Sequence, residues 1–128
     1  MVEQFSKLGE HGAIWVAIGL AGAAADEARR EDWLRGARRV GIAYVINQVV
    51  KVIVRRERPA DKQAATMSNL SFPSAHTTTS FCGARMYARL GINLYPLAFA
   101  LAASRLALRV HHPSDVAAGA VLGTVIAR

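Results

Sequence analysis

Cysteine, proline and acidic residues are all scarce in this chain of 128 residues. The single cysteine, Cys82, excludes an intrachain disulfide framework and a metal cluster held by several thiolates. With four prolines the chain has no proline-rich linker, and it shows no internal repeat or low-complexity tail. Nine acidic residues stand against 16 basic ones, which gives a net charge of +7. This excess of positive charge favours an acidic partner, such as nucleic acid, anionic lipid or a phosphorylated substrate.

A long uninterrupted apolar run is also missing, although 52% of the residues are hydrophobic. The apolar residues fall into five shorter segments that we expect to be helices, namely 12–25, 36–54, 76–90, 94–110 and 114–127. A membrane span needs roughly 20 apolar residues, and shorter runs are often buried core helices. Glycine and alanine are frequent in all five segments and favour close helix packing in lipid. We therefore predict a membrane-embedded bundle, with a soluble helical bundle as the alternative.

The charges outside these segments predict an orientation. The N-terminus lacks a basic region before its first apolar block, so we expect no cleavable signal peptide. If the five segments alternate in direction, one side collects a group of arginines: Arg29, Arg30, Arg35, Arg38, Arg39, Arg85, Arg89 and Arg128. The positive-inside tendency makes that side cytoplasmic, although the opposite side also carries basic residues. The polar helix ends would then face outside.

The first polar cluster is KVIVRRERP, residues 51–59. Lys51, Arg55 and Arg58 are spaced at i, i+4 and i+7, which places them on one face of a helix. Pro59 disfavours helix at Arg58, so we expect the chain to turn away there. Taken alone, the cluster also fits a solvated basic helix end that binds lipid headgroups.

The second cluster is SFPSAHTTTSF, residues 71–81, at the start of an apolar segment. Ser74 is a good N-cap candidate, and a helix N-terminus offers N–H groups and a partial positive charge to an anion. His76 falls in the first turn of this helix. The alternative is capping alone, with the histidine at an interface. The threonines 77–79 fit packing and bonding to the helix backbone better than chemistry.

The third cluster is SRLALRVHHPSD, residues 104–115. Pro113 suits the first turn of the last helix, and Asp115 lies in that turn. His111 and Asp115 are four residues apart, so the carboxylate can accept a hydrogen bond from one imidazole nitrogen and leave the other facing a site. The alternative is an aspartate favoured by the helix dipole and a histidine at the interface.

With alternating helices, the three clusters meet on one face of the bundle. They bring together fixed cations, a helix N-terminus and two histidines. A phosphate needs this set, because cations and N–H groups bind its oxygens while one group attacks phosphorus and another protonates the leaving group.

The spacing of the clusters resembles that of a known family. In chain order the sequence has Lys51, six residues, Arg58-Pro59; then Pro73-Ser74-Ala75-His76; then Ser104-Arg105, five residues, His111, three residues and Asp115. This order resembles the three-part signature of the type 2 phosphatidic acid phosphatase (PAP2) superfamily, which also includes bacterial acid phosphatases and vanadium haloperoxidases. The resemblance covers residues 51–115. It implies an all-α, integral membrane helical bundle of about five transmembrane helices, in a single domain of residues 1–128.

The sequence departs from the family at two points. The family usually has glycine where Ala75 stands, and a methyl group is tolerated there only if the backbone is not left-handed. The membrane members usually have six spans, and this chain offers five. The missing span would be N-terminal, which leaves the position of residues 1–30 open.

The resemblance implies a role for each matched residue. The phosphate would be bound by five of them: Lys51, Arg58, Ser74, Ala75 and Arg105. His111 would attack phosphorus and form a phosphohistidine, and Asp115 would orient it. His76 would protonate the departing alcohol and then activate water. His112 stands where the family often has an aromatic residue and is left out, and no metal or other cofactor is implied.

The implied activity is that of a metal-independent membrane phosphatase acting on a phosphomonoester or pyrophosphate of a lipid. The motifs also resemble actinobacterial members that act on polyprenyl-linked phosphates, such as decaprenylphosphoryl-5-phosphoribose. The expected partners are this phosphorylated lipid and membrane lipids, not nucleic acid. The expected location is the bacterial plasma membrane, with the active site on the extracytoplasmic face. A soluble acid phosphatase or vanadate-dependent peroxidase, and a non-enzymatic membrane scaffold or small transporter, stay open as alternatives, as does the oligomeric state.

Overall fold

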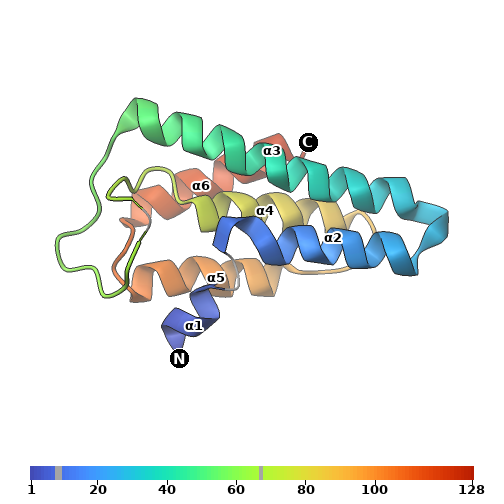
Figure 1. Ribbon diagram of the computed structural model, residues 1–128, viewed down its shortest axis with the longest axis horizontal. Helices are drawn as coiled ribbons and strands as arrows, with labels where there is room; N and C mark the ends of the chain where they lie inside the picture. Colours follow the sequence, from blue (N-terminus) through green and yellow to red (C-terminus); the bar gives the residue numbers. More distant parts are fainter. Residues whose placement is uncertain (8–9, 67) are drawn as a thin grey trace.

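The structure is an all-helical bundle built from the five predicted segments (Figure 1). It is a computed structural model that describes residues 1–7, 10–66 and 68–128, and within these ranges the only β-pairing is an isolated bridge between Glu57 and Leu70. The main helices are α2 (Ala13–Ala25), α3 (Arg30–Val54), α4 (Ala75–Ala88), α5 (Tyr95–Ala107) and α6 (Pro113–Ile126). Short 3-10 turns cover Glu10–Gly12 and Glu27–Arg29. The prediction of an all-α fold is confirmed.

Two helices differ from the prediction. Helix α3 begins at Arg30 and not at residue 36, because Trp33 of this charged stretch is buried and attaches it to the core. A short additional helix, α1 (Val2–Lys7), lies at the N-terminus. Its six residues are too few to show an apolar period, so sequence analysis could not find it.

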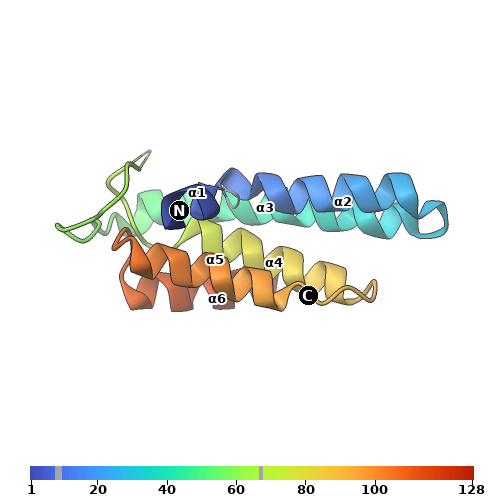
Figure 2. The same ribbon diagram turned by 90° about the horizontal axis from the view of Figure 1, so that it is seen from below.

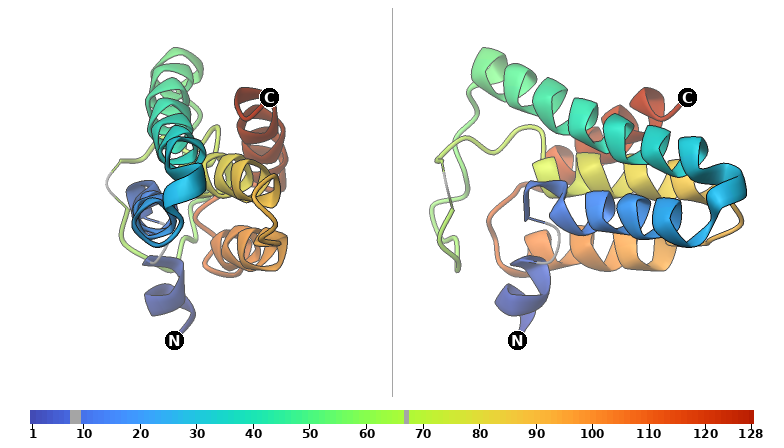
Figure 3. Two further views of the ribbon diagram at one scale, coloured as in Figure 1. Left: turned by 90° about the vertical axis from the view of Figure 1, so that its right-hand side faces the viewer. Right: turned by 45° about the vertical axis from the view of Figure 1, so that its right-hand side comes forward.

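Helix α4 lies at the centre of the bundle, in contact with α2, α3, α5 and α6 (Figures 1 and 3). Ten of its 14 residues are buried, which explains why it carries no charged residue before Arg85. Thr78 and Thr79 are fully buried, and their hydroxyls donate to the carbonyls of Ser74 and Ala75 at 2.9 and 3.0 Å. This confirms the predicted packing and backbone bonding for Thr78 and Thr79, while the hydroxyl of the buried Thr77 donates to that of Ser74 at 3.0 Å.

Two glycines let α6 pack directly against the backbone of α4. A Cβ atom at Gly119 would lie 2.8 Å from the carbonyl oxygen of Ser74, and one at Gly123 would collide with the carbonyl of Thr78. The amide of Ser74 also donates to the carbonyl of Asp115 at 3.1 Å. These contacts hold the N-terminal ends of α4 and α6 together, and so bring the second and third sequence clusters next to each other.

One end of the bundle collects the polar helix ends. The C-terminal ends of α3 and α5 and the N-terminal ends of α4 and α6 lie there, with residues 55–66 and 68–74 between α3 and α4 (Figures 1 and 2). At the other end, arginines bind carbonyls near helix C-termini: Arg29 donates to Leu90 at 3.1 Å and Arg39 to Ile126 at 2.7 Å. No helix in the described ranges combines the length and the apolar character that a membrane crossing requires.

Candidate active site

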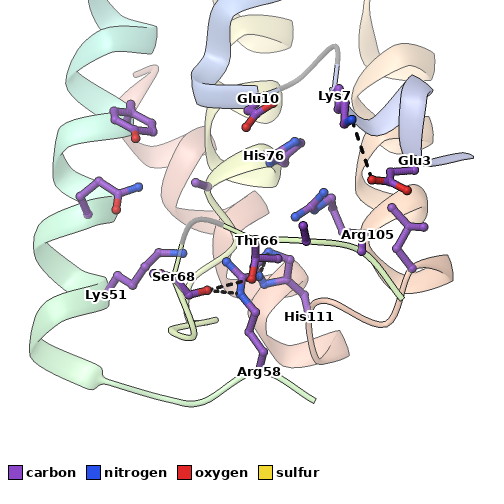
Figure 4. A pocket seen from close by; sticks show the side chains of 16 residues that line it. Glu3, Lys7, Glu10, Lys51, Arg58, Thr66, Ser68, His76, Arg105 and His111 are labelled. Atoms are coloured by element: carbon purple, nitrogen blue, oxygen red, sulfur yellow. Dashed lines mark hydrogen bonds and ion pairs between the residues drawn. The ribbon is translucent and has the colours of Figure 1, made fainter. Parts of the chain in front are cut away.

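A cavity of about 520 Å³ opens at the polar end of the bundle. Six of the eight residues predicted for the site line it: Lys51, Arg58, Ala75, His76, Arg105 and His111. Figure 4 shows Lys51 and Arg105 on opposite sides of the cavity, with His111 beside Arg58 between them. The other two predicted residues, Ser74 and Asp115, are fully buried and do not line the cavity. The three sequence clusters therefore converge as predicted.

His111 bonds one ring nitrogen to the protein and keeps the other on the cavity side. Its Nδ1 lies 2.8 Å from the carbonyl oxygen of Ser71, an acceptor only, so we assign the ring proton to Nδ1. Nε2 then carries the lone pair, 3.2 Å from the guanidinium of Arg58. The side chain is 2% exposed, so the ring is fixed in this orientation. This is the tautomer that a nucleophilic imidazole needs when it attacks through Nε2.

Asp115 contacts His111 less directly than the sequence predicted. Its Oδ2 lies 3.6 Å from Nδ1 of His111, too far for a direct hydrogen bond, and accepts the main-chain N–H of His112 at 2.7 Å. Its Oδ1 accepts from Arg56 at 2.9 Å. Because the Nδ1 proton is directed to Ser71, the carboxylate acts on the imidazole mainly through its charge.

The surroundings of His111 favour the neutral ring. Burial lowers the pKa of His111 to about 4, and the neighbouring Asp115 opposes this shift. Three nearby cations lower the pKa further: Arg58, Arg105 and Lys51. A neutral imidazole at physiological pH has the lone pair that attack on phosphorus requires.

The three predicted cations line the cavity, each held by a different segment. Lys51 lies in the last turn of α3 and is 5% exposed. Arg58 follows α3 and donates to the carbonyls of Ser68 and Val110 at 2.8 and 2.9 Å. Arg105 lies in the last turn of α5, and its buried Nε has no hydrogen-bond partner among the described residues. An anionic oxygen in the cavity would satisfy such a donor.

The helical spacing predicted for the first cluster is wrong beyond Lys51. Helix α3 ends at Val54, and Arg55 follows in a left-handed conformation with φ of 56°. Arg55 is exposed, and Arg58 reaches the cavity from the segment after the helix. The two motif cations Lys51 and Arg58 meet because the chain folds back, not because they share a helical face.

The N-terminal end of α4 is capped as predicted. Ser74 is the N-cap residue, and its hydroxyl accepts from the amide of Thr77 at 3.4 Å. Ala75 begins the helix without a positive φ, so its methyl group is compatible with a position that is usually glycine. His76 is half-buried, with Nε2 2.9 Å from the carbonyl oxygen of Ser6.

Helix α1 supplies cavity residues that the sequence did not predict. The hydroxyl of Ser6 accepts from Nη1 of Arg105 at 2.7 Å, while the carbonyl of the same residue contacts His76. Ser6 itself is buried, and three other residues of the N-terminal segment line the cavity: Glu3, Lys7 and Glu10. No motif marks these positions, and only the folded chain brings them to the site.

His112 has a structural position. It is the N-cap residue of α6, it does not line the cavity, and its Nε2 lies 3.1 Å from the carbonyl oxygen of Glu57. In the described part of the chain, no group of three or more His, Cys, Asp or Glu side chains is arranged to hold a metal ion. The groups available to a ligand in the cavity are thus cations, imidazoles and a few neutral or acidic side chains.

Sequence comparison finds relatives over most of the chain. Residues 39–128 match the PAP2 superfamily. The chain is 42% identical over 120 residues to the decaprenylphosphoryl-5-phosphoribose phosphatase of Mycolicibacterium smegmatis, covering 89% of this chain and 67% of that protein. It is 39% identical over 130 residues to the protein of the same name from Mycobacterium tuberculosis, covering 94% of this chain and 72% of that protein.

The fold also has a counterpart among solved structures. It is similar to the crystal structure of the first transmembrane PAP2 type phosphatidylglycerolphosphate phosphatase from Bacillus subtilis, with a TM-score of 0.84. The superposition covers 98% of this chain and 71% of that chain at 23% identity, which bears on the fold alone. On the sequence match and the identity to the mycobacterial proteins, the chain belongs to the PAP2 superfamily.

Proposed function

We propose that this PAP2 phosphatase hydrolyses a phosphate ester or pyrophosphate of a lipid through a phosphohistidine on His111. The observation that carries the proposal is the cavity in which Lys51, Arg58 and Arg105 surround the Nε2 side of a neutral His111. Fixed cations of this kind attract a phosphate dianion and stabilise the charge that shifts onto its oxygens during transfer.

In the proposed first step, Nε2 of His111 attacks phosphorus while the bond from phosphorus to the leaving oxygen breaks. Arg58, 3.2 Å from Nε2, must release that nitrogen and bind a phosphate oxygen instead. The ring becomes positively charged when the N–P bond forms. Ser71 at 2.8 Å and Asp115 at 3.6 Å from Nδ1 then stabilise the proton that this nitrogen carries.

His76 is the proposed acid and base. Its protonated ring gives a proton to the leaving oxygen in the first step. In the second step the neutral ring takes a proton from water, which attacks the phosphohistidine, breaks the N–P bond and restores His111. In the structure Nε2 of His76 lies 2.9 Å from the carbonyl oxygen of Ser6. A leaving oxygen that takes the place of this carbonyl oxygen would be close enough to receive the proton from Nε2.

For the substrate we propose a polyprenyl-linked sugar phosphate, with decaprenylphosphoryl-5-phosphoribose as the first compound to test. Two relatives at 42% and 39% identity are named for that compound. The cavity, at about 520 Å³, extends beyond the three cations, and the polar side chains that line the rest of it include Glu3, Glu10, Gln48 and Thr66. Carboxylate, amide and hydroxyl groups are suitable partners for sugar hydroxyls.

We also propose that residues 1–128 form one domain integrated in the bacterial plasma membrane by about five helices, with the cavity on the extracytoplasmic side. Large apolar side chains are exposed on the bundle surface, as expected for contact with lipid: Ile42, Val45, Val49, Val52, Ile53, Phe99, Val121 and Val125. The arginines at the end opposite the cavity favour a cytoplasmic location for that end. Recovery in the membrane pellet after carbonate extraction is the expected result, and recovery in the supernatant would contradict this placement.

Phosphate release in detergent tests the activity. The substrates are decaprenylphosphoryl-5-phosphoribose, phosphatidic acid and phosphatidylglycerol phosphate, each with and without EDTA. We expect release in the presence of EDTA, fastest with the first substrate, and competition by orthovanadate as an analogue of the phosphoryl transition state. Absence of release from all three contradicts the proposed function. If EDTA abolishes phosphate release and magnesium restores it, the metal-independent mechanism is contradicted. If release is fastest with another lipid, only the proposed substrate is wrong.

A further inference from the structure

Arg56 lies behind the cavity and contacts the site from the protein side. It follows the C-terminal end of α3 and is not one of the residues matched to the family motifs. Its Nη1 donates to Oδ1 of Asp115 at 2.9 Å and to the hydroxyl of Ser114 at 2.6 Å. Its guanidinium also lies over the ring of Phe72, 4.7 Å from the centroid. Together these contacts hold a side chain that is 39% exposed in one position.

The main chain of Arg56 fixes the other partner of His111. The amide of Ser71 donates to the carbonyl of Arg56 at 2.7 Å, and the carbonyl of Ser71 accepts the Nδ1–H of His111 at 2.8 Å. Arg56 therefore holds Ser71 through its backbone and Asp115 through its side chain. Both groups that face Nδ1 of His111 are attached to this one residue.

The charge of Arg56 is placed where no substrate displaces it. Asp115 is fully buried, and a buried carboxylate requires a cation or several donors. The charged groups around His111 come from four segments: Lys51, Arg58, Arg105 and Asp115. The first three line the cavity, where a phosphate would bind them in the proposed reaction. Arg56 does not line the cavity, and among the described residues it is the only arginine or lysine paired with Asp115.

We propose that Arg56 is a positioning residue, which holds the Asp115 carboxylate beside His111 while the phosphohistidine forms and breaks. The inference rests on the proposed function, because it requires His111 as the nucleophile. Arg56 touches neither the substrate nor the reacting atoms and acts through Asp115.

Two substitutions of Arg56 test its charge: Arg56→Gln removes the charge, and Arg56→Lys keeps it. In Arg56→Gln the carboxylate acts on the imidazole without a competing cation, which raises the pKa of His111 and moves the acid limb of kcat/KM to higher pH. Phosphorylation at neutral pH slows by about 10²-fold, because the Asp115 carboxylate is then less firmly held beside the imidazolium that forms with the N–P bond. Arg56→Lys keeps the charge, so its acid limb stays at the wild-type position and part of the rate returns. The exposed neighbour Arg55 supplies the matched control, Arg55→Gln.

The experiment measures single-turnover phosphoenzyme formation from p-nitrophenyl phosphate in detergent against pH, with the melting temperature of each variant. A shifted acid limb in Arg56→Gln, and in neither Arg56→Lys nor Arg55→Gln, is the expected result. An unshifted limb in Arg56→Gln overturns the proposal even if the rate falls, since a merely structural residue would change the rate alone. An equal shift in Arg55→Gln overturns it as well, because overall charge would then explain the effect.

Two further results keep the test decisive. If Arg56→Gln does not fold, Arg56→Met carries the same test, because it also removes the charge: a shifted acid limb supports the proposal, and an unshifted limb overturns it. If the wild-type protein forms no phosphoenzyme, the proposed function fails first. If the wild-type protein forms a phosphoenzyme but the acid limb of Arg56→Gln is unshifted, the role proposed for Arg56 fails and the proposed function stands.

Discussion

The two histidines of the cavity are held in different ways. His111 is bonded to Ser71 and lies beside Arg58 and Asp115, all within the stretch that carries the three sequence clusters. His76 contacts Ser6, a residue of α1 that lies far outside that stretch. The hydroxyl of the same Ser6 accepts a hydrogen bond from Arg105, so one residue of α1 contacts both an imidazole and a cation of the cavity.

This difference separates a preorganised part of the site from an adjustable one. The orientation of His111 is set by buried groups of the bundle and does not depend on a ligand. The contacts of His76 and Arg105 with Ser6 depend on α1, which packs mainly on α5. We therefore expect changes around His111 to affect every substrate, and changes around His76 to depend on the leaving group or on affinity.

The largest effect is expected from His111→Ala. Without the nucleophile no phosphoenzyme forms, so turnover falls by on the order of 10⁴-fold or more with every substrate. The adjacent His112→Ala is the matched control, because that ring does not line the cavity and contacts the carbonyl of Glu57. Losing such a hydrogen bond costs about 1 kcal/mol, so we expect a small change in stability and nearly normal turnover. Comparable losses in the two variants would contradict the assignment.

A smaller and selective effect is expected from His76→Ala. A lipid alkoxide is a poor leaving group and needs a proton, so its release should slow by on the order of 10² to 10⁴. p-Nitrophenolate leaves without help, so phosphoenzyme formation from p-nitrophenyl phosphate should change far less. Rapid-quench measurement with both substrates gives the comparison. Equal slowing with both would show that His76 is not the acid for the leaving group.

Acidification should act on His111 with a defined sign. Burial lowers the pKa of His111 from 6.5 to about 4 in the folded protein, so kcat/KM should fall about tenfold per pH unit below pH 4. The unfolded chain takes up this proton at higher pH, so the free energy of unfolding should decrease between about pH 6.5 and 4. Activity and melting temperature against pH test both statements, with His111→Ala as the control that lacks this part of the stability change. An acid limb near 6.5 would contradict the buried neutral ring.

The smallest effect is expected from Ser6→Ala. A phosphate oxygen that replaces the Ser6 hydroxyl on Arg105 must displace a 2.7 Å hydrogen bond. Removing the hydroxyl removes this competitor, so KM should fall by about two- to tenfold with little change in kcat. Val2→Ala, on the exposed side of α1, is the control. A higher KM in Ser6→Ala would mean that the hydroxyl supports Arg105 and does not compete with the substrate.

The sequence predicted the parts of the fold and site that follow from residue type and spacing. Antiparallel alternation of five apolar segments was enough to bring His76, His111 and the three cations together. The sequence-based prediction failed where a tertiary contact determines the extent of a helix. Helix α3 extends back to Arg30 because Trp33 is buried, and α1 forms because it packs on α5. The acceptor for His111 is the main-chain carbonyl of Ser71, and a carbonyl carries no signal of residue type.

The central claim is that His111 is the nucleophile and His76 the acid and base, and the site of phosphorylation tests it most directly. His76→Ala and His111→Ala are incubated with radiolabelled p-nitrophenyl phosphate, quenched in alkali, and the label is mapped to a peptide. We predict label on His111 in His76→Ala, which accumulates because water is no longer activated, and no label in His111→Ala. Label on His76 in His111→Ala would exchange the two roles, and label in neither protein would contradict a phosphohistidine intermediate.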